Sequence, residues 1–294
     1  MFHRAGKLVV AAAASAAAGA IASPSAQAQT FPDADLLNFA LNLEYLGAEF
    51  YVRAVTGRGL YYNGALSLPL FHPAEGPILV PANTLVPFET PAIAYYAQRL
   101  ANDELAHVGF IQDVLTQIEM SHPIIAYIGE PMIDLTTSWT TLAVAAGLIV
   151  PGQTFNPFAS EVDFLLGAYF LEDLCVSAYA GLLDTLTSPA NVAYTASILA
   201  TEGFHAGAIR GYLSTIGAGV ATDALSALRA RLSGVGDNGT DANGNPFNFS
   251  NVDINGQAFR RTPQQVLAVV YGGNTSGGGF FPNGVNGTIT TAAA

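Results

Sequence analysis

The sequence predicts an all-α protein built around a four-helix bundle, and three observations carry this prediction. Apolar residues recur at helical spacing along four long segments. Stretches rich in proline and glycine separate these segments. Two of the segments carry the motif Glu-x-x-His, and the other two carry a single glutamate inside an apolar stripe.

The four helices are expected at residues 33–57, 91–119, 160–186 and 189–216. Residues 57–90 contain five prolines and predict a long crossover. Residues 123–160 predict an insertion with one short helix near residues 135–148, and further short helices are expected near residues 222–232 and 263–271. We therefore assign residues 29–233 to the bundle and residues 234–294 to a loop-rich C-terminal extension packed on it.

The first residues have the features of an export signal. Residues 1–28 combine a basic start at Arg4 and Lys7, an apolar run at residues 8–21 and the small-residue sequence Ala26-Gln27-Ala28, after which we expect cleavage. The apolar run is shorter than the roughly 18 residues that a membrane-spanning helix needs, which disfavours a membrane anchor. We expect a secreted protein, periplasmic or extracellular, without a membrane span.

The amino-acid composition of the chain restricts the classes of molecule that it can bind. The chain has 294 residues, of which 51% are hydrophobic and 11% charged, with a formal net charge of −12. Loss of Arg4 and Lys7 takes this charge to −14 and removes the only lysine. Nucleic acid is disfavoured as a partner because phosphate binding needs clustered basic residues. Metal cations suit this acidic chain better, and a single cysteine excludes an internal disulfide.

The two halves of the bundle repeat one pattern. Glu44 and Glu172 each precede a tyrosine by seven residues, at Tyr51 and Tyr179. The other two helices share the pattern Glu-x-x-His-x-Gly-x-Ile. The repeat predicts a pseudo-twofold set of six metal ligands: Glu44, Glu104, His107, Glu172, Glu202 and His205.

The spacing and surroundings of these residues favour two metal ions. Residues three apart lie on one helical face, about 5–6 Å apart at Cβ, so a glutamate and a histidine reach the same ion or adjacent ions. Four buried carboxylates would each cost several kcal/mol unless they were neutralised, and two divalent cations would neutralise them. In the alternative interpretation, the two Glu-x-x-His motifs are ion pairs on solvent-exposed helix faces. This alternative is disfavoured because the residues that flank the motifs are apolar. Carboxylate and imidazole ligands suit iron or manganese and leave positions open for oxygen or peroxide.

This ligand set is the one known from di-iron and di-manganese carboxylate bundles. By that analogy, Glu44 and Glu172 are terminal ligands, Glu104 and Glu202 are bridges, and one histidine completes each metal. We predict two iron ions as the cofactor, with manganese as the alternative, because both metals accept these ligands.

Three stretches carry a resemblance to a known family: residues 37–46, both Glu-x-x-His helices, and residues 262–267 with 280–284. They resemble the ferritin-like family that includes plant desiccation-related proteins, over nearly the whole mature chain. The resemblance implies a secreted four-helix domain with a di-iron site. Gly47 departs from the family pattern, in which we expect a further acidic residue, but it lies outside the ligand set.

Two functions follow as alternatives. One is redox handling of oxygen or peroxide at the metal pair. The other is a non-catalytic role in metal binding or in protection during desiccation and stress. A ferritin-type storage cage is disfavoured because the long insertions would interrupt the helical surfaces that pack together in such a cage.

Several other residues are weaker candidates. Tyr51 and Tyr179 either act on the ligands, by hydrogen bonding or electron relay, or are core aromatics; the same choice applies to Tyr96 and Tyr194. Cys175 is expected to be a small buried residue rather than a ligand. Four carboxylates are expected to be solvated or to contact the ligand histidines: Glu49, Asp103, Glu161 and Asp173. Residues 237–245 predict a turn-rich surface segment rather than a calcium loop.

Overall fold

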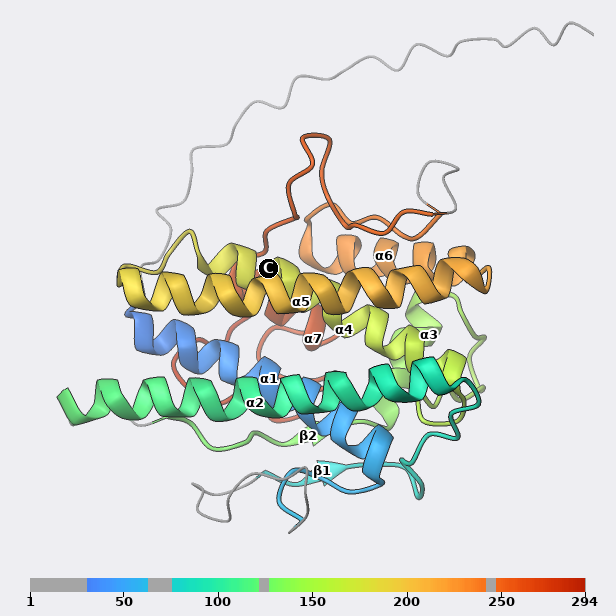
Figure 1. Ribbon diagram of the computed structural model, residues 1–294, viewed down its shortest axis with the longest axis horizontal. Helices are drawn as coiled ribbons and strands as arrows, with labels where there is room; N and C mark the ends of the chain where they lie inside the picture. Colours follow the sequence, from blue (N-terminus) through green and yellow to red (C-terminus); the bar gives the residue numbers. More distant parts are fainter. Residues whose placement is uncertain (1–30, 63–75, 122–126, 242–246, 294) are drawn as a thin grey trace, which may run out of the picture. The chain divides into compact units, whose positions relative to one another are not determined.

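Four long helices carry the predicted ligands (Figure 1): α1 (Asp33–Thr56), α2 (Pro91–Ser121), α4 (Glu161–Leu182) and α5 (Pro189–Thr215). The computed structural model describes residues 31–62, 76–121, 127–241 and 247–293. The predicted export signal therefore lies outside the described residues. The all-α four-helix prediction is confirmed, with helix ends close to those expected from the sequence.

Local chemistry sets these helix ends. Gly57 ends α1 in the left-handed conformation, with φ 72°, which glycine adopts without a steric penalty. The Ser160 hydroxyl caps α4 by accepting a hydrogen bond from the Asp163 backbone N–H at 3.1 Å. Pro189 occupies the first turn of α5, where its missing N–H costs nothing.

Two carboxylates show the directions of the four helices. Asp33, at the start of α1, accepts hydrogen bonds from the backbone N–H groups of Thr187 and Ser188, just before α5. Glu161, at the start of α4, accepts from the backbone N–H groups just before α2. Helices α1 and α5 therefore begin at one end of the bundle, and α2 and α4 begin at the other. Helix α1 packs against α2, and α4 against α5.

This arrangement corrects the predicted place of the crossover. Because α2 and α4 run in the same direction, the chain must return along the bundle between them, within residues 122–160. The 57–90 connection instead brings the chain back beside the end of α1, where the Val86 N–H donates to the Ala54 carbonyl at 2.9 Å. Proline content predicted a long connection there but carried no information about helix direction.

The connection between α1 and α2 and the connection between α2 and α4 each contain one very short strand, and the two strands pair with each other. The sequence did not predict these strands. Strand β1 (Ile78–Leu79) pairs in parallel with β2 (Ile133–Asp134). Helix α3 (Thr137–Ala146) follows β2 and is the predicted inserted helix. Strands of two residues are too short to show the alternation that identifies a strand in a sequence.

The last part of the chain packs on α4. Helices α6 (Gly219–Ser233) and α7 (Pro263–Val270) contact each other and α4. Thr262 and Gln265 form a reciprocal capping box at the start of α7. Gly181 of α4 lies directly beneath the extension, because a Cβ at this position would lie 2.0 Å from the Arg261 carbonyl oxygen. From Phe31 onward, bundle and extension belong to one contact unit.

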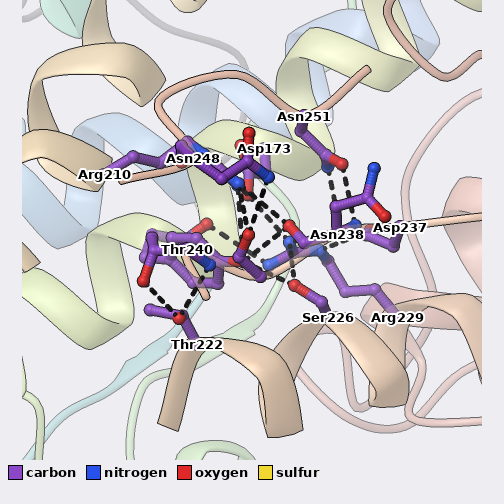
Figure 2. Close-up of polar contacts among 12 residues, drawn as sticks. Asp173, Arg210, Thr222, Ser226, Arg229, Asp237, Asn238, Thr240, Asn248 and Asn251 are labelled. Carbon is purple, nitrogen blue, oxygen red and sulfur yellow. Dashed lines mark hydrogen bonds and ion pairs between the residues drawn. The ribbon is translucent and has the colours of Figure 1, made fainter. Parts of the chain in front are cut away.

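A buried network of charges joins the extension to the bundle (Figure 2). Asp173 of α4 pairs with Arg210 of α5 at 2.7 Å and with Arg229 of α6 at 2.8 Å. Asp237 pairs with Arg229 and with Arg261, each at 2.8 Å. All three arginines are fully buried. Asp237 thus lies in a buried ion-pair network rather than in the expected surface segment; the rest of that segment continues into residues 242–246, outside the described residues.

One helix in the described part of the chain meets the length and composition of a membrane span. This helix is α4, with 89% of its apolar window buried inside the protein. It also carries Glu172 and Asp173 in its buried part. The core of the bundle accounts for its apolar character, as it does for α1, in which residues 36–52 are all buried.

Candidate metal centre

The six predicted ligands meet inside the bundle. Their donor atoms form two groups, each with all its atoms within 4.8 Å of one another: Glu44, Glu104, His107 and Glu202 in the first, and Glu104, Glu172, Glu202 and His205 in the second. Glu104 and Glu202 belong to both groups. This is the arrangement that the predicted bridging role requires.

The two groups are related by the pseudo-twofold repeat. His107 Nδ1 lies 3.3 Å from Glu44 Oε2 and 3.2 Å from Glu202 Oε1. His205 Nδ1 lies 3.3 Å from Glu172 Oε2 and 3.5 Å from Glu104 Oε1. Each imidazole therefore directs the same ring nitrogen toward one terminal and one shared carboxylate. The ring centroids are 6.3 Å apart.

The atoms that face inward have no hydrogen-bond partner. They are Oε2 of Glu44 and Glu172, Oε1 of Glu104, both carboxylate oxygens of Glu202, and Nδ1 of both histidines. Their contacts of 3.2–3.9 Å lack hydrogen-bond geometry. Buried polar atoms are rarely left without a partner, and each unsatisfied atom is costly. A donor set of carboxylate oxygens and imidazole nitrogens around a shared centre fits a pair of iron or manganese ions.

The pKa values of the cluster show the same excess of negative charge. Burial, together with the carboxylates of Glu172 and Glu44, raises the pKa of Glu104 to about 8. Burial opposes the charge on His107, but the Glu44 and Glu202 carboxylates outweigh it and raise the pKa of His107 to about 12. Burial and the Glu104 carboxylate raise the pKa of Glu202 well above its ordinary value. Without a cation, the cluster is neutralised by bound protons.

Metal binding should therefore release protons. Metal ligands must be deprotonated, whereas His107 and Glu104 hold protons at neutral pH in the metal-free protein. We expect the apparent affinity for Mn(II) to rise with pH, and to rise less steeply above about pH 8, where Glu104 has lost its proton but His107 still holds one. Calorimetric titration in two buffers of different ionisation enthalpy measures the protons released per metal. Binding without proton release, or affinity independent of pH, would contradict this prediction.

The terminal glutamates are held by tyrosines from the opposite half of the repeat. The Tyr51 hydroxyl of α1 donates to Glu172 Oε1 of α4, and the Tyr179 hydroxyl of α4 donates to Glu44 Oε1 of α1. Each glutamate thus binds a tyrosine with its outer oxygen and presents Oε2 to the cluster. Of the two alternatives for these tyrosines, the structure favours a contact with the ligands. Tyr96 instead donates to the His205 carbonyl at 3.2 Å, and Tyr194 packs edge-on against Phe110.

Replacement of Tyr51 by phenylalanine should weaken metal binding without unfolding the protein. The change frees the outer oxygen of Glu172, and loss of such an outer contact typically lowers metal affinity by about 10- to 100-fold. Mn(II) titration of the metal-free variant gives the affinity. Tyr45→Phe is the matched control, because Tyr45 is equally buried on α1 but bonds Gln112 and the Ile128 carbonyl instead of a ligand. Equal effects of the two variants would show that Tyr51 acts through folding alone.

Gly47 and Cys175 occupy equivalent positions, three residues after Glu44 and Glu172. A Cβ at residue 47 would lie 2.3 Å from Glu104 Oε2, so the observed position of Glu104 requires glycine there. Burial and the nearby Glu202 and Glu44 carboxylates raise the pKa of the Cys175 thiol well above its ordinary value. A neutral thiol, rather than a thiolate ligand, is the consequence, although the residue keeps some exposed surface.

Of the four other carboxylates that the sequence singled out, only Asp103 contacts a predicted metal ligand. Asp103 Oδ2 lies 3.2 Å from the outer ring nitrogen of His205. The other three take part in the fold: Glu49 pairs with Arg53, Glu161 accepts from the backbone before α2, and Asp173 joins the buried arginines. Helical spacing placed Asp103 next to a ligand but gave no sign of which histidine it would reach.

Comparison with known proteins relates the chain to one family. Residues 32–215 match the family described as "Ferritin-like domain". The chain is 31% identical over 255 residues to a desiccation-related protein of Craterostigma plantagineum, covering 80% of this chain and 76% of that protein. It is also 27% identical over 281 residues to a ferritin-like catalase of Nesocodon mauritianus, covering 87% of this chain and 84% of that protein.

Proposed function

Because the chain belongs to the ferritin-like domain family, we propose that it binds two iron or manganese ions and uses them in the redox chemistry of peroxide. One observation carries this proposal: two ligand groups share Glu104 and Glu202, and their inward-facing atoms have no other partner. The similarity to a protein named ferritin-like catalase supports peroxide as the substrate.

The residues have distinct parts in this proposal. Glu104 and Glu202 would be shared by the two metal ions, Glu44 and His107 would complete one set of ligands, and Glu172 and His205 would complete the other. When bound, two such ions would supply the two-electron redox change by which two molecules of hydrogen peroxide become two of water and one of oxygen. The apolar helices around the cluster exclude bulk water, and Tyr51 and Tyr179 hold the terminal carboxylates in position.

A second function is a non-catalytic role in which the protein binds metal or protects during desiccation. The similarity to a desiccation-related protein favours it. The two functions make different predictions for the same metal-loaded protein. Under the catalytic hypothesis, each site turns over hydrogen peroxide many times. Under the non-catalytic hypothesis, the protein binds metal stoichiometrically and does not turn over peroxide.

Elemental analysis and an oxygen electrode test the proposal. The purified protein should contain two iron or manganese ions per chain, and peroxide should release oxygen only when these ions are present. Metal-free protein prepared with a chelator is the control. A native protein that holds no iron or manganese, and takes up none, would refute the metal site. A protein that binds the metal but does not turn over peroxide would instead support the second, non-catalytic function.

We also propose that the protein works outside the cytoplasm, after removal of residues 1–28. The support is the basic start, apolar run and small-residue sequence of that segment. N-terminal sequencing of the protein recovered from its host should begin at Gln29. A mature protein that begins at Met1 would contradict this expectation.

A further inference from the structure

The two histidines of the site differ in what holds their outer ring nitrogen. His205 Nε2 lies 3.2 Å from Asp103 Oδ2, and Arg99 donates to the same carboxylate oxygen at 2.8 Å. Within the described part of the chain, no group bonds the outer nitrogen of His107. The His107 side chain is also more exposed, 10% against 3% for His205.

The pairing of α2 with α5 shows which residue stands in the equivalent place. These helices run antiparallel across the site, and His107 contacts Glu202 just as His205 contacts Glu104. The same register that sets Asp103 opposite His205 sets Thr201 opposite His107. Asp103 precedes Glu104 and Thr201 precedes Glu202, so the two are equivalent in the repeat. Thr201 has a shorter side chain without charge, and its hydroxyl donates to the Ser197 carbonyl of its own helix at 3.3 Å.

A carboxylate at the outer nitrogen of a ligand histidine strengthens metal binding. It accepts the N–H of the imidazole, fixes the tautomer that leaves the other nitrogen free, and makes that nitrogen more basic. In His205 the nitrogen left free by Asp103 is Nδ1, which faces Glu172 and Glu104. His107 has the same Nδ1 position but lacks this support.

We propose that the two metal positions are unequal: Asp103 is a positioning residue that makes the position of Glu172 and His205 the tight one, and Thr201 leaves the position of Glu44 and His107 weaker. This inference rests on the proposed dinuclear site. It concerns a difference between the two halves of the repeat, Asp103 against Thr201, and not the ligand set itself. The weaker position fills second and exchanges its metal faster.

Calorimetric titration of the metal-free protein with Mn(II) tests the proposal. We expect two binding steps in the unmodified protein. Asp103→Ala should weaken the tighter step by about 10- to 100-fold and leave the weaker step unchanged. Thr201→Asp should strengthen the weaker step and bring the two affinities closer together, which a purely structural role of residue 201 would not do.

Two control variants separate this effect from folding. Thr201→Ala removes the side chain without adding a carboxylate and should leave both steps unchanged. Arg99→Gln breaks the exposed ion pair with Asp103 but keeps the carboxylate, so the tighter step should remain the tighter one. Two equal steps in the unmodified protein, or equal weakening of both steps by Asp103→Ala, would overturn the inference. Absence of any Mn(II) or Fe(II) binding would instead refute the dinuclear site.

Discussion

Replacement of both Glu104 and Glu202 by alanine should abolish the binding of both metal ions. These are the two residues shared by the ligand groups, so their loss leaves each position with one carboxylate and one histidine. The remaining pairs, Glu44 with His107 and Glu172 with His205, come from different helices and no longer have a bridge between them. Metal content after loading and dialysis should fall from two ions per chain to none.

The same double variant should remain folded. Burial and repulsion among the carboxylates raise the pKa of Glu104 and Glu202 in the metal-free protein, which shows that their charges are unfavourable there. Their removal relieves this repulsion and leaves a cavity, two effects of opposite sign. Circular dichroism should show the helical content unchanged. Glu89→Ala, which removes an exposed glutamate outside the site, should retain both metals; full metal content in the double variant would refute the bridging role.

Replacement of Asp237 by alanine should destabilise the protein by about 3–5 kcal/mol, because it removes the carboxylate that pairs with buried Arg261 and one of the two carboxylates that pair with buried Arg229. Arg229 and Arg261 both pair with Asp237, and neither side chain reaches solvent. Urea unfolding followed by circular dichroism measures the change. Asp184→Ala is the matched control: its pair with Arg260 is 53% exposed on both sides, and its loss should cost about 0–1 kcal/mol.

Acid should reduce the effect of the Asp237 variant. Burial favours the neutral carboxyl, but Arg229 and Arg261 outweigh it and hold the pKa of Asp237 below its ordinary value of 3.8. A depressed pKa in the folded state stabilises the protein above the ordinary pKa, and this contribution is lost as the pH falls. The stability difference between the unmodified protein and the variant should therefore be full at pH 7 and shrink below pH 3.8. A difference that grows in acid would contradict this ion-pair account.

Much of the candidate metal centre could be predicted from the sequence because helical spacing is local. Glu104 and His107 lie three residues apart, and one helical turn is enough to place them on one face. The repeat in α5 then indicated a second pair. The burial of four carboxylates with few basic residues nearby supplied the argument for cations. None of these steps required the directions of the helices.

The contacts that depend on packing between distant segments could not be predicted. Tyr51 bonds Glu172 rather than the glutamate on its own helix, and this exchange follows only from how α1 lies against α4. Asp237 looked like part of a solvated turn because the arginines that neutralise it come from α6 and from the loop that leads into α7. The crossover was placed wrongly for the same reason, since helix direction is not a local property.

The burial of the arginines also limits cleavage of the folded protein by proteases of the trypsin class, which cut after lysine and arginine. After residue 28 the chain has no lysine and eight arginines, three of which are fully buried and paired with Asp173 or Asp237: Arg210, Arg229 and Arg261. Only Arg58, Arg99, Arg231 and Arg260 are exposed, and two of these lie inside helices, where the backbone is not free to enter a protease cleft. A protein with this distribution of arginines offers such enzymes very few sites until it unfolds.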